Sequence, residues 1–493
     1  MEMKLQKLLS KIEYKAIGDL DPNFNVEELC HDSRRTHENA VFVCIKGALS
    51  DGHDYIGSAY SRGCRYFITE KEVDLPPDAC ILITLDTRKA LSLMSAEFFE
   101  NPADELTVIG ITGTKGKTTT SLMIYEILNK CGKSCGYIGS NGVDFGKFHY
   151  ETANTTPESY DLQMYMREMV LAGVKYLVME VSSQALYLHR VHGIKFDICI
   201  YTNLSVDHIG GHEHPTFEHY KECKRTLFSD YGADTVIYNA DDEYASEMIS
   251  NVKNAKTVSY SICNIADYFA TDITSYKKDD ALGIEFSINS SKKRYKGRLC
   301  FPGKFSVYNA LSAVSACVEC GIDIDVIANT LEKIRIKGRF ELVKALPYAM
   351  FIIDYAHNEV SLTSALNALR EYSPTRLICL FGSVGGRTQG RRAEMGRVAS
   401  RLADFSIITS DNPDFEDPES IMSDIESQFD DKDKYIKISD RKEAIAYAVR
   451  IARKGDVFLF AGKGHENYQL ILGKKIPFSE KEILENLSLT LTE

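Results

Sequence analysis

The chain has 493 residues, enough for about three domains of ordinary size. Hydrophobic residues make up 44% and charged residues 26%, with 32 Gly and 12 Pro, which is typical of globular protein and argues against global disorder. The 58 Lys and Arg are outnumbered by 70 Asp and Glu, and a net charge of −12 does not suit a protein that binds nucleic acid or an anionic membrane.

Signals for export and membrane insertion are missing from the sequence. The longest apolar runs, such as VFLFAG (457–462), fall well short of the ~20 residues that cross a bilayer. The first residues, MEMKLQKLL, lack the apolar core of a signal peptide. We therefore expect a cytoplasmic protein. The 13 cysteines are scattered and lie mostly in apolar runs, so we read them, including the CxxC pair Cys317 and Cys320, as reduced structural residues.

Short β-rich runs alternate with amphipathic helical patterns from residue 103 onward, which predicts parallel sheets covered by helices. Before them, residues 1–102 form a smaller unit with strands at 40–45 and 64–69. The stretch 257–300 alternates polar and apolar residues and carries a basic run at 290–298, which we read as the solvated edge of an exposed hairpin. The predicted strands of the two α/β blocks are 107–112, 176–181, 196–204 and 234–241, then 351–356, 376–382, 405–412 and 456–462.

A phosphate-binding loop follows the first strand of the central block. The segment Gly113-Thr114-Lys115-Gly116-Lys117-Thr118-Thr119 connects that strand to a strong helix pattern at 120–130. Glycines let backbone N–H groups face anionic oxygens, a lysine reaches the terminal phosphates and a threonine binds Mg²⁺. The spacing is that of the shorter GxxGKT form, because Ile111 stands where the full motif has glycine. We expect ATP or another small nucleotide here.

Acidic and imidazole groups end two further strands of this block. Glu180 closes one strand, and Asp207-His208 follow the next. Because ligands bind at the carboxyl ends of parallel strands, these groups are candidates for holding metal ions against phosphate oxygens. A helix-capping or core role is the alternative for each of them.

These motifs together resemble the Mur ligases, and among them the MurE group, over nearly the whole chain. MurE ligases use ATP to add the third residue to UDP-N-acetylmuramoyl-L-Ala-D-Glu. The matching motifs are Asp32-Ser33-Arg34, Asp51-Gly52-His53, TGTKGKTT (112–119), Asn154-Thr155-Thr156-Pro157, EVSS (180–183), His189-Arg190, TNLSxDH (202–208), Tyr220 with Lys224, NADD (239–242), GKFSVYN (303–309), Gly338-Arg339, Asp354-Tyr355-Ala356-His357, Asp411-Asn412-Pro413, Asp440-Arg441 and GKGHE (462–466).

The resemblance implies an α/β protein of three domains. These are a small N-terminal UDP-binding domain (1–102), a central P-loop ATPase-like domain with a parallel sheet (103–337) and a C-terminal Rossmann-like domain that binds the amino acid (338–493). It implies ATP and Mg²⁺ as cofactors, small-molecule substrates and a monomer, with no nucleic-acid or membrane partner. Domain closure would exclude water from a reactive acyl phosphate.

The resemblance also implies site residues. Catalysis falls to Lys117, Glu180, His208 and Lys224, and metal ions to Thr118, Glu180, His208 and Lys224, the last as N6-carboxylysine. From the residues alone, the favoured interpretation of Lys224 is a solvated lysine on an ordinary amphipathic helix, and only the family pattern reverses it. ATP contacts are residues 113–119 with Asn309, Arg339 and Asp354; UDP-precursor contacts are Ser33, Thr155, Thr156, Ser182 and Arg190; amino-acid contacts are Arg387, Asp411, Asn412, Asp414, Gly462 and Glu466.

The residue after Asp411-Asn412-Pro413 discriminates between amino acids in the family. Enzymes that use meso-diaminopimelate typically have arginine there, whereas this chain has Asp414. Because a carboxylate repels the distal carboxylate and attracts an ammonium, we predict L-lysine, with L-ornithine or meso-diaminopimelate as alternatives. A third possibility is that Asp414 only caps the helix beginning near Pro418 or faces water.

Several departures from the family pattern leave other functions open. Gln184 replaces a histidine, Gly386 and Thr388 replace acids, Ser306 replaces an asparagine, and Ala48-Leu49 stand where polar uridine contacts are common. A diverged paralogue with another substrate is one alternative. A second is an amide ligase of the folylpolyglutamate or cyanophycin type, which the separate N-terminal unit disfavours. A noncatalytic scaffold is disfavoured by the two intact metal sites.

Overall fold

The computed structural model describes residues 2–47, 50–210, 213–278, 281–291, 293–386 and 389–490. Internal contacts divide the chain into two compact units, residues 1–268 with 312–322, and residues 269–311 with 323–493. Within the described ranges, no helix is both long enough and apolar enough to cross a membrane. The three-domain boundaries expected from the sequence are finer than this division into two units.

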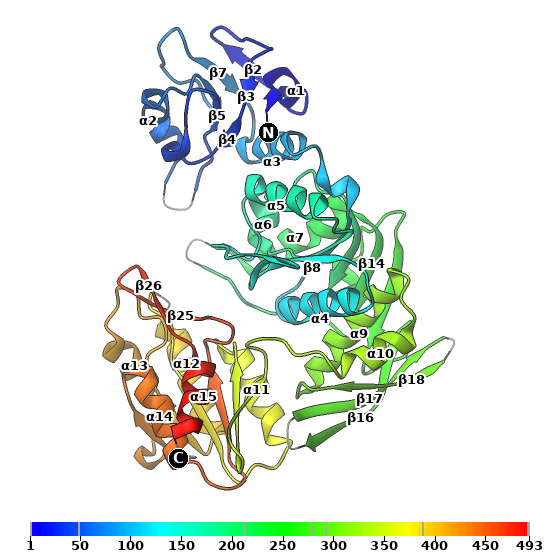
Figure 1. Ribbon diagram of the computed structural model, residues 1–493, viewed down its shortest axis with the longest axis vertical. Coiled ribbons are helices and arrows are strands. Elements are labelled where there is room, and N and C mark those ends of the chain that lie inside the picture. The colour runs from blue at the N-terminus through cyan, green and yellow to red at the C-terminus, as the bar shows by residue number, and fades with distance from the viewer. Residues whose placement is uncertain are drawn as a thin grey trace. The chain divides into compact units, whose positions relative to one another are not determined.

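The N-terminal part of the first unit is a small sheet with helices (Figure 1). Its strand order is β2-β7-β6-β5-β4, parallel except for β2, and β1 pairs separately with β3. The predicted strands at 40–45 and 64–69 are confirmed as β5 and β6. The elements are β1 (Met3–Lys4), α1 (Leu5–Leu9), β2 (Lys15–Ile17), β3 (Asn25–Val26), β4 (Glu28–Cys30), β5 (Ala40–Val43), α2 (Ile56–Ser61), β6 (Tyr66–Thr69), β7 (Cys80–Ile83) and α3 (Thr87–Phe98).

The rest of the first unit is built on a sheet with the order β11-β10-β9-β12-β8-β13-β14-β15. Strands β9, β12, β8, β13, β14 and β15 are parallel, and β10 and β11 add an antiparallel edge. The elements are β8 (Thr107–Thr112), α4 (Lys117–Lys130), β9 (Cys135–Gly139), β10 (Gly142–Phe145), β11 (Phe148–Tyr150), α5 (Ser159–Leu171), β12 (Tyr176–Glu180), α6 (Ser183–Tyr187), β13 (Phe196–Tyr201), α7 (Phe217–Thr226), β14 (Ala233–Asn239), α8 (Ala245–Met248) and β15 (Lys256–Ser261).

The stretch predicted as an exposed hairpin forms three long strands. Strand β17 pairs antiparallel with β18, and the side chains of Arg294 and Lys296 are exposed, as expected for a solvated edge. Two helices follow before the C-terminal sheet. The elements are β16 (Tyr268–Lys278), β17 (Ala281–Ser290), β18 (Arg294–Leu299), α9 (Lys304–Glu319) and α10 (Ile324–Leu331).

The C-terminal sheet has the order β19-β20-β24-β21-β22-β23, with all pairs parallel except β19 with β20. Helices lie over its two faces, and a hairpin, β25 with β26, follows it (Figure 1). The elements are β19 (Glu341–Leu346), β20 (Ala349–Asp354), α11 (Glu359–Arg370), β21 (Leu377–Phe381), α12 (Gln389–Leu402), β22 (Phe405–Ile408), α13 (Pro418–Glu426), β23 (Tyr435–Lys437), α14 (Arg441–Ile451), β24 (Val457–Ala461), β25 (Tyr468–Ile471), β26 (Lys474–Pro477) and α15 (Glu480–Thr490).

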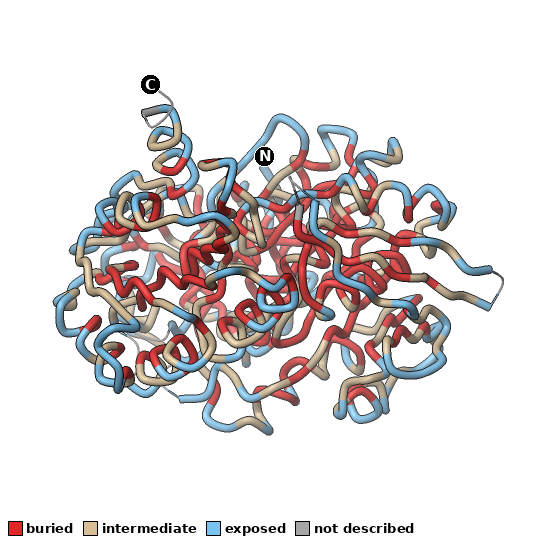
Figure 2. Tube along the Cα trace, turned by 90° about the horizontal axis from the view of Figure 1, so that it is seen from below, coloured by how far each residue is buried: buried red, intermediate tan, exposed pale blue. Residues whose placement is uncertain are grey.

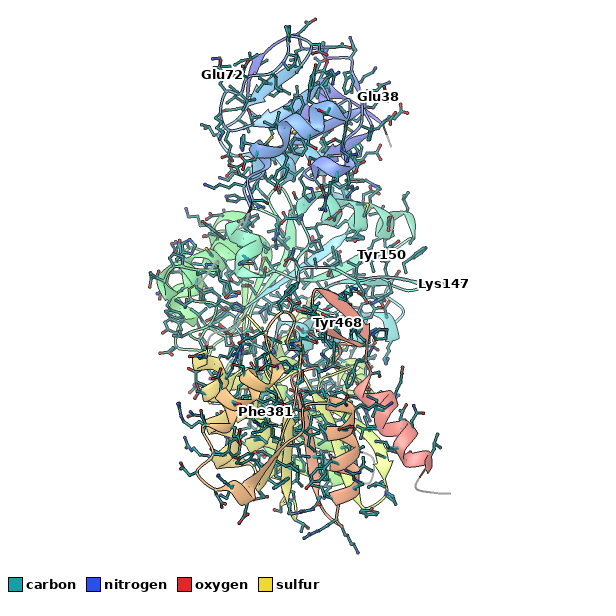
Figure 3. The ribbon with its side chains drawn as sticks, turned by 90° about the vertical axis from the view of Figure 1, so that its left-hand side faces the viewer. Glu38, Glu72, Lys147, Tyr150, Phe381 and Tyr468 are labelled. Carbon is teal, nitrogen blue, oxygen red and sulfur yellow. The ribbon has the colours of Figure 1, made fainter. Side chains whose placement is uncertain are left out.

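Burial explains why apolar runs predicted these strands well. Buried segments run through the interior while the connecting loops are exposed (Figure 2). Strands buried on both faces read as continuous apolar runs, as in β21 and β24. Phe381, at the end of β21, lies within the C-terminal sheet, whereas Tyr468 lies on the hairpin (Figure 3). The strands predicted at 196–204 and 405–412 end earlier, at Tyr201 and Ile408.

Candidate active site

The predicted phosphate loop connects β8 to α4, as the sequence requires. Gly113 has φ +147°, and a Cβ there would lie 2.0 Å from Thr202 Oγ1, so only glycine fits this turn. Gly116, at φ +85°, precedes the first residue of α4. The loop therefore ends at a helix N-terminus, where unpaired N–H groups and the helix dipole favour an anion.

Strand β13 ends beside this loop and holds it in place. The Asn203 side chain accepts from Lys115 N at 2.9 Å and donates to Lys115 O at 3.0 Å. Thr202 Oγ1 donates to the same carbonyl at 2.7 Å. These contacts give the TN pair of the TNLSxDH motif a structural role, since they fix the loop's backbone. The sequence did not predict this role, because the role depends on contacts between segments that lie far apart in the chain.

Thr118 and Glu180 form a buried oxygen cluster at the carboxyl ends of the strands. Thr118 Oγ1 donates to Glu180 Oε2 at 2.9 Å, and both residues are buried. The other carboxylate oxygen, Oε1, accepts from Tyr137 OH at 2.8 Å and from Ser140 N at 2.9 Å. Hydroxyl and carboxylate oxygens are the donors that Mg²⁺ prefers, so this pair fits the metal expected from the sequence.

Two lysines converge on one carbonyl oxygen behind the loop. Lys117 Nζ donates to Gly113 O at 2.8 Å, and Lys224 Nζ donates to the same oxygen at 3.0 Å. Lys224 is 1% exposed, so the solvated-lysine reading of α7 is wrong. Burial, together with the neighbouring Lys117 charge, holds the Lys224 pKa well below its ordinary value. Lys224 is thus disposed to be a neutral amine, the form that reacts with CO₂.

Asp207 and His208 lie near the same loop but point in different directions. Asp207 pairs with Lys115 Nζ at 2.9 Å; burial raises its pKa, but Lys115 and His208 outweigh burial and lower it to about 2. His208, at φ +59°, places Nδ1 3.1 Å from Glu213. Its ring centroid is 5.9 Å from that of Tyr220, whose OH lies 3.1 Å from Thr114 Oγ1. His208 therefore contacts Glu213 and lies near Tyr220, which in turn contacts Thr114 of the phosphate loop.

Three of the predicted precursor contacts surround Glu180. Thr155 Oγ1 is 3.1 Å from Ser140 Oγ, and Thr156 Oγ1 donates to Glu180 O at 2.8 Å. The backbone N–H of Ser182 donates to Thr156 Oγ1 at 3.2 Å. Ser182 follows β12, as the sequence predicted, and Thr156 contacts both the last residue of that strand and Ser182.

The two other predicted precursor contacts are placed differently. Arg190 is buried and pairs with Glu158 at 2.8 Å, while Glu158 also lies 3.3 Å from Arg88 of the N-terminal part. Arg190 thus has an ionic partner within the chain, which sequence reading did not foresee. Ser33 is buried at the start of a 3₁₀ turn in the N-terminal part, where its carbonyl accepts from Thr36 Oγ1 at 2.7 Å.

The second unit carries the other predicted ATP contacts. Asn309 is buried on α9, and Asp354 ends β20 and accepts from Phe340 N at 3.0 Å. The Arg339 guanidinium lies 5.0 Å from the Tyr355 ring centroid. Arg339 lines a cavity of about 460 Å³ together with Arg335 and Lys337. Those three cations suit an anionic ligand.

Burial raises the pKa of Asp354 to about 6, although Arg339 acts in the opposite direction. A folded-state pKa above the unfolded value means that stability is lost as pH rises from about 4 to 6. Asp354→Asn removes this titration. The free energy of unfolding of the variant, relative to that of the wild type, should therefore rise by about 2 to 3 kcal/mol between pH 4 and pH 7. Urea unfolding at both pH values measures the difference. If the difference in unfolding free energy between variant and wild type were the same at pH 4 and pH 7, this prediction would be wrong.

Four of the six predicted amino-acid contacts, Asp411, Asn412, Gly462 and Glu466, come together around a buried lysine. Lys463 Nζ donates to Asn412 Oδ1 at 2.8 Å and to Glu466 Oε2 at 2.9 Å, and lies 3.2 Å from Asp411 Oδ1. Asn412 Nδ2 also donates to Glu466, at 2.9 Å. A Cβ on Gly462 would lie 2.6 Å from the Asp411 carboxylate, so glycine allows this close approach. The sequence analysis missed Lys463, whose place inside the GKGHE motif was the available signal.

Arg441 supports this cluster from behind. It is fully buried, pairs with Glu480 of α15 at 2.9 Å and donates to the backbone of Ser410 and Ala461 at 3.1 Å. These two carbonyls precede Asp411 and Gly462. Arg441 therefore fixes the ends of both segments that carry the predicted amino-acid contacts.

Asp414 serves the hairpin rather than a helix. Its carboxylate accepts from Gly473 N at 2.7 Å, and its backbone pairs with Leu470 and Leu472. The helix beginning at Pro418 is capped by Asp417, so the capping role considered for Asp414 is wrong. One predicted contact, Arg387, lies outside the described residues.

Models of known protein families match three parts of the chain. Residues 25–102 match the model of the Mur ligase family catalytic domain, residues 111–317 the Mur ligase middle domain, and residues 338–464 the Mur ligase glutamate ligase domain. These three matches support the three-domain α/β organisation predicted from the sequence.

Relatives match over the whole length. The chain is 40% identical to UDP-N-acetylmuramoyl-L-alanyl-D-glutamate--2,6-diaminopimelate ligase 1 of Clostridium acetobutylicum, in an alignment that covers 98% of both chains. It is 39% identical to UDP-N-acetylmuramoyl-L-alanyl-D-glutamate--2,6-diaminopimelate ligase of Caldanaerobacter subterraneus, in an alignment that covers 98% of this chain and 99% of the relative. A solved structure of a UDP-N-acetylmuramoyl-L-alanyl-D-glutamate--2,6-diaminopimelate ligase aligns over 100% of both chains with a TM-score of 0.71 and 28% identity.

More distant structures share the fold. MurF from Acinetobacter baumannii aligns over 99% of both chains with a TM-score of 0.67 and 20% identity. The chain therefore belongs to the Mur ligase family and, within it, to the ATP-dependent ligases of the MurE type.

Proposed function

We propose that this protein joins a diamino acid to the D-Glu carboxylate of UDP-N-acetylmuramoyl-L-Ala-D-Glu, with conversion of ATP to ADP and phosphate, as a cytoplasmic monomer. The observation that carries the proposal is the buried Thr118–Glu180 pair at the mouth of the phosphate loop, with Lys117 and Lys224 meeting at Gly113 O. The names of full-length relatives at 36 to 40% identity support the precursor as substrate.

Transfer of the γ-phosphate to the substrate carboxylate gives an acyl phosphate, which an amine attacks to form the amide and release phosphate. In this scheme the loop N–H groups at the start of α4 and the Lys117 ammonium hold the phosphate charge. Asn309, Arg339 and Asp354 are the proposed contacts for the rest of the nucleotide. Excluding water protects the acyl phosphate from hydrolysis.

Thr118 and Glu180 are the residues that would hold Mg²⁺, and a bound ion would supply charge stabilisation to the phosphate oxygens. We propose His208 and carbamylated Lys224 for a second ion. A carbamate replaces a lysine positive charge with a carboxylate-like group, the ligand that such an ion prefers. The depressed pKa of Lys224 supports this modification.

For the precursor we propose Ser33, Thr155, Thr156, Ser182 and Arg190 as contacts. Thr155, Thr156 and Ser182 present hydroxyls beside Glu180, which suits a substrate carboxylate brought to the phosphate site. Arg190 is held by its ion pair with Glu158, and this pair would position its guanidinium for the precursor.

For the amino acid we propose the cluster of Asp411, Asn412, Gly462 and Glu466, with Arg387 as the carboxylate contact. The relatives' names favour meso-diaminopimelate, the alternative in our sequence analysis, over L-lysine. The case for lysine rests on the Asp414 charge, and that carboxylate is bound by Gly473 N–H. We therefore propose meso-diaminopimelate as the added residue, with L-lysine as the competing candidate.

Incubation of the enzyme with ATP, Mg²⁺ and the UDP-dipeptide, with each amino acid added separately, tests this proposal. We expect the mass of the meso-diaminopimelate tripeptide and a kcat/KM at least about 10²-fold above that for L-lysine, because a site that pairs a substrate charge rejects analogues lacking it. Faster turnover of L-lysine or L-ornithine would restore the Asp414 argument. Absence of any tripeptide would point to a diverged substrate.

A further inference from the structure

Three soft donor groups meet beside the phosphate site, where neither the sequence analysis nor the proposed mechanism uses them. His214, His219 and Cys223 each place one nitrogen or sulfur atom within 4.8 Å of the others. Among the described residues, no other set of three His, Cys, Asp or Glu side chains meets this condition. His214 is 1% exposed and Cys223 is 8% exposed, so the group lies in the interior.

The spacing of these atoms fits a single tetrahedral ion. His214 Nδ1 and His219 Nδ1 are 2.9 Å apart, and Cys223 Sγ is 3.7 Å from His219 Nδ1. Zinc with its usual bond lengths separates two nitrogen ligands by about 3.3 Å, and nitrogen from sulfur by about 3.5 Å. These two separations are close to those values, and the donor atoms of His214 and Cys223 lie within 4.8 Å of each other. Cys223 Sγ is also 3.9 Å from His219 Nε2, so rotation of the His219 ring would aim one nitrogen at the ion.

The surroundings orient the donors as a metal site requires. His214 Nε2 lies 2.9 Å from Ser183 Oγ, and a histidine ligand commonly donates its second nitrogen to an oxygen in this way. His219 and Cys223 are four residues apart on α7, so they share one face of the helix. The Tyr187 ring covers His219 edge-on at 4.9 Å.

The chemistry of the three donor groups also indicates which kind of ion they would bind. Neutral imidazoles with one thiolate select a softer ion than the Mg²⁺ that prefers oxygen.

We propose that His214, His219 and Cys223 form a binding site for a thiophilic divalent ion of the Zn²⁺ class, distinct from the Thr118–Glu180 pair. The site links α7 to the segment that carries His208. His214 N donates to His208 O at 3.1 Å, so an ion on His214 restrains the backbone of His208. Occupancy would therefore stiffen one wall of the active site without adding a group to the reaction.

Cobalt titration of the full-length, chelator-treated protein tests the proposal. Co²⁺ in a tetrahedral site with a thiolate gives a near-ultraviolet charge-transfer band and intense visible bands. We expect both bands to saturate at one equivalent and Zn²⁺ to abolish them. Cys223→Ser should lose the charge-transfer band, whereas Cys263→Ser, a change at an exposed cysteine, should keep it.

Two further variants separate metal binding from folding. His219→Ala changes a half-buried residue and should lose the tetrahedral spectrum while its circular dichroism stays that of wild type. Ser183→Ala removes only the oxygen behind His214 and should weaken Co²⁺ binding by about 10-fold. Absence of the charge-transfer band in the wild type, or its survival in Cys223→Ser, would overturn the proposal.

Discussion

Replacing Glu180 by glutamine is expected to lower kcat for ATP-dependent amide formation by about 10³-fold. The amide has nearly the shape of the carboxylate but carries no charge, so the oxygen cluster with Thr118 can no longer attract a divalent cation. Because the residue is fully buried at the end of β12, water cannot replace the lost ligand. The decrease in kcat should therefore be larger than the decrease caused by removing any single hydrogen bond in the cluster.

A magnesium titration of the ligation rate, with product identified by mass, measures this effect. Tyr137→Phe is the matched control, because it removes one hydrogen bond to Glu180 and leaves the charge in place. We expect that control to lose less than about 10-fold, in keeping with one hydrogen bond. If Glu180→Gln retained wild-type kcat at saturating Mg²⁺, the carboxylate would have no part in metal binding.

The phosphate loop was predictable because its signal is local. A strand, two glycines with a lysine and a threonine, and a helix follow one another without interruption, and each imposes its own backbone geometry. Glu180 was predictable for a related reason, since parallel strands deliver their last residues to one edge of the sheet. Both inferences use only a few neighbouring residues.

The missed features depend on contacts between distant segments. Lys463 lies three residues before its partner Glu466 in the GKGHE motif, but its other partners, Asp411 and Asn412, lie about fifty positions earlier in the chain. The contact that Asp414 makes with the hairpin was missed for the converse reason. The charge of Asp414 suggested a ligand contact, but the hairpin that binds it follows some sixty residues later. A local sequence pattern shows which side chains are present. Their contacts with distant segments of the chain determine the role of each one.

The family resemblance, not periodicity, singled out Lys224. Its helix reads as an ordinary amphipathic segment, and α7 does expose other charged residues such as Glu218 and Glu222. What distinguishes Lys224 is complete burial beside Lys117, which no charge pattern on one helix reveals. A buried lysine next to another cation is costly unless it loses its proton or changes its chemistry.

Lys224→Ala is accordingly expected to reduce kcat by about 10³-fold, a loss comparable to that of a metal ligand. If the residue acts as a carbamate, millimolar formate or acetate should restore part of the activity of Lys224→Ala by supplying the missing carboxylate. The same acids should not help Glu180→Gln, whose side chain still fills its site. Initial rates with and without added acid measure this rescue.

Lys221→Ala provides the control on the same helix. Lys221 lies one turn earlier and pairs with Glu218 and Glu247, away from the phosphate loop, so its loss should change kcat by less than about 2-fold. Removing bicarbonate and CO₂ from the wild-type enzyme should lower activity reversibly, because the carbamate forms from neutral amine and CO₂. Full activity of Lys224→Ala without any acid would show that the buried lysine is structural. If Lys224→Ala had low activity that added acid did not restore, the role of Lys224 would be its contact with the Gly113 carbonyl, and the carbamate proposal would be wrong.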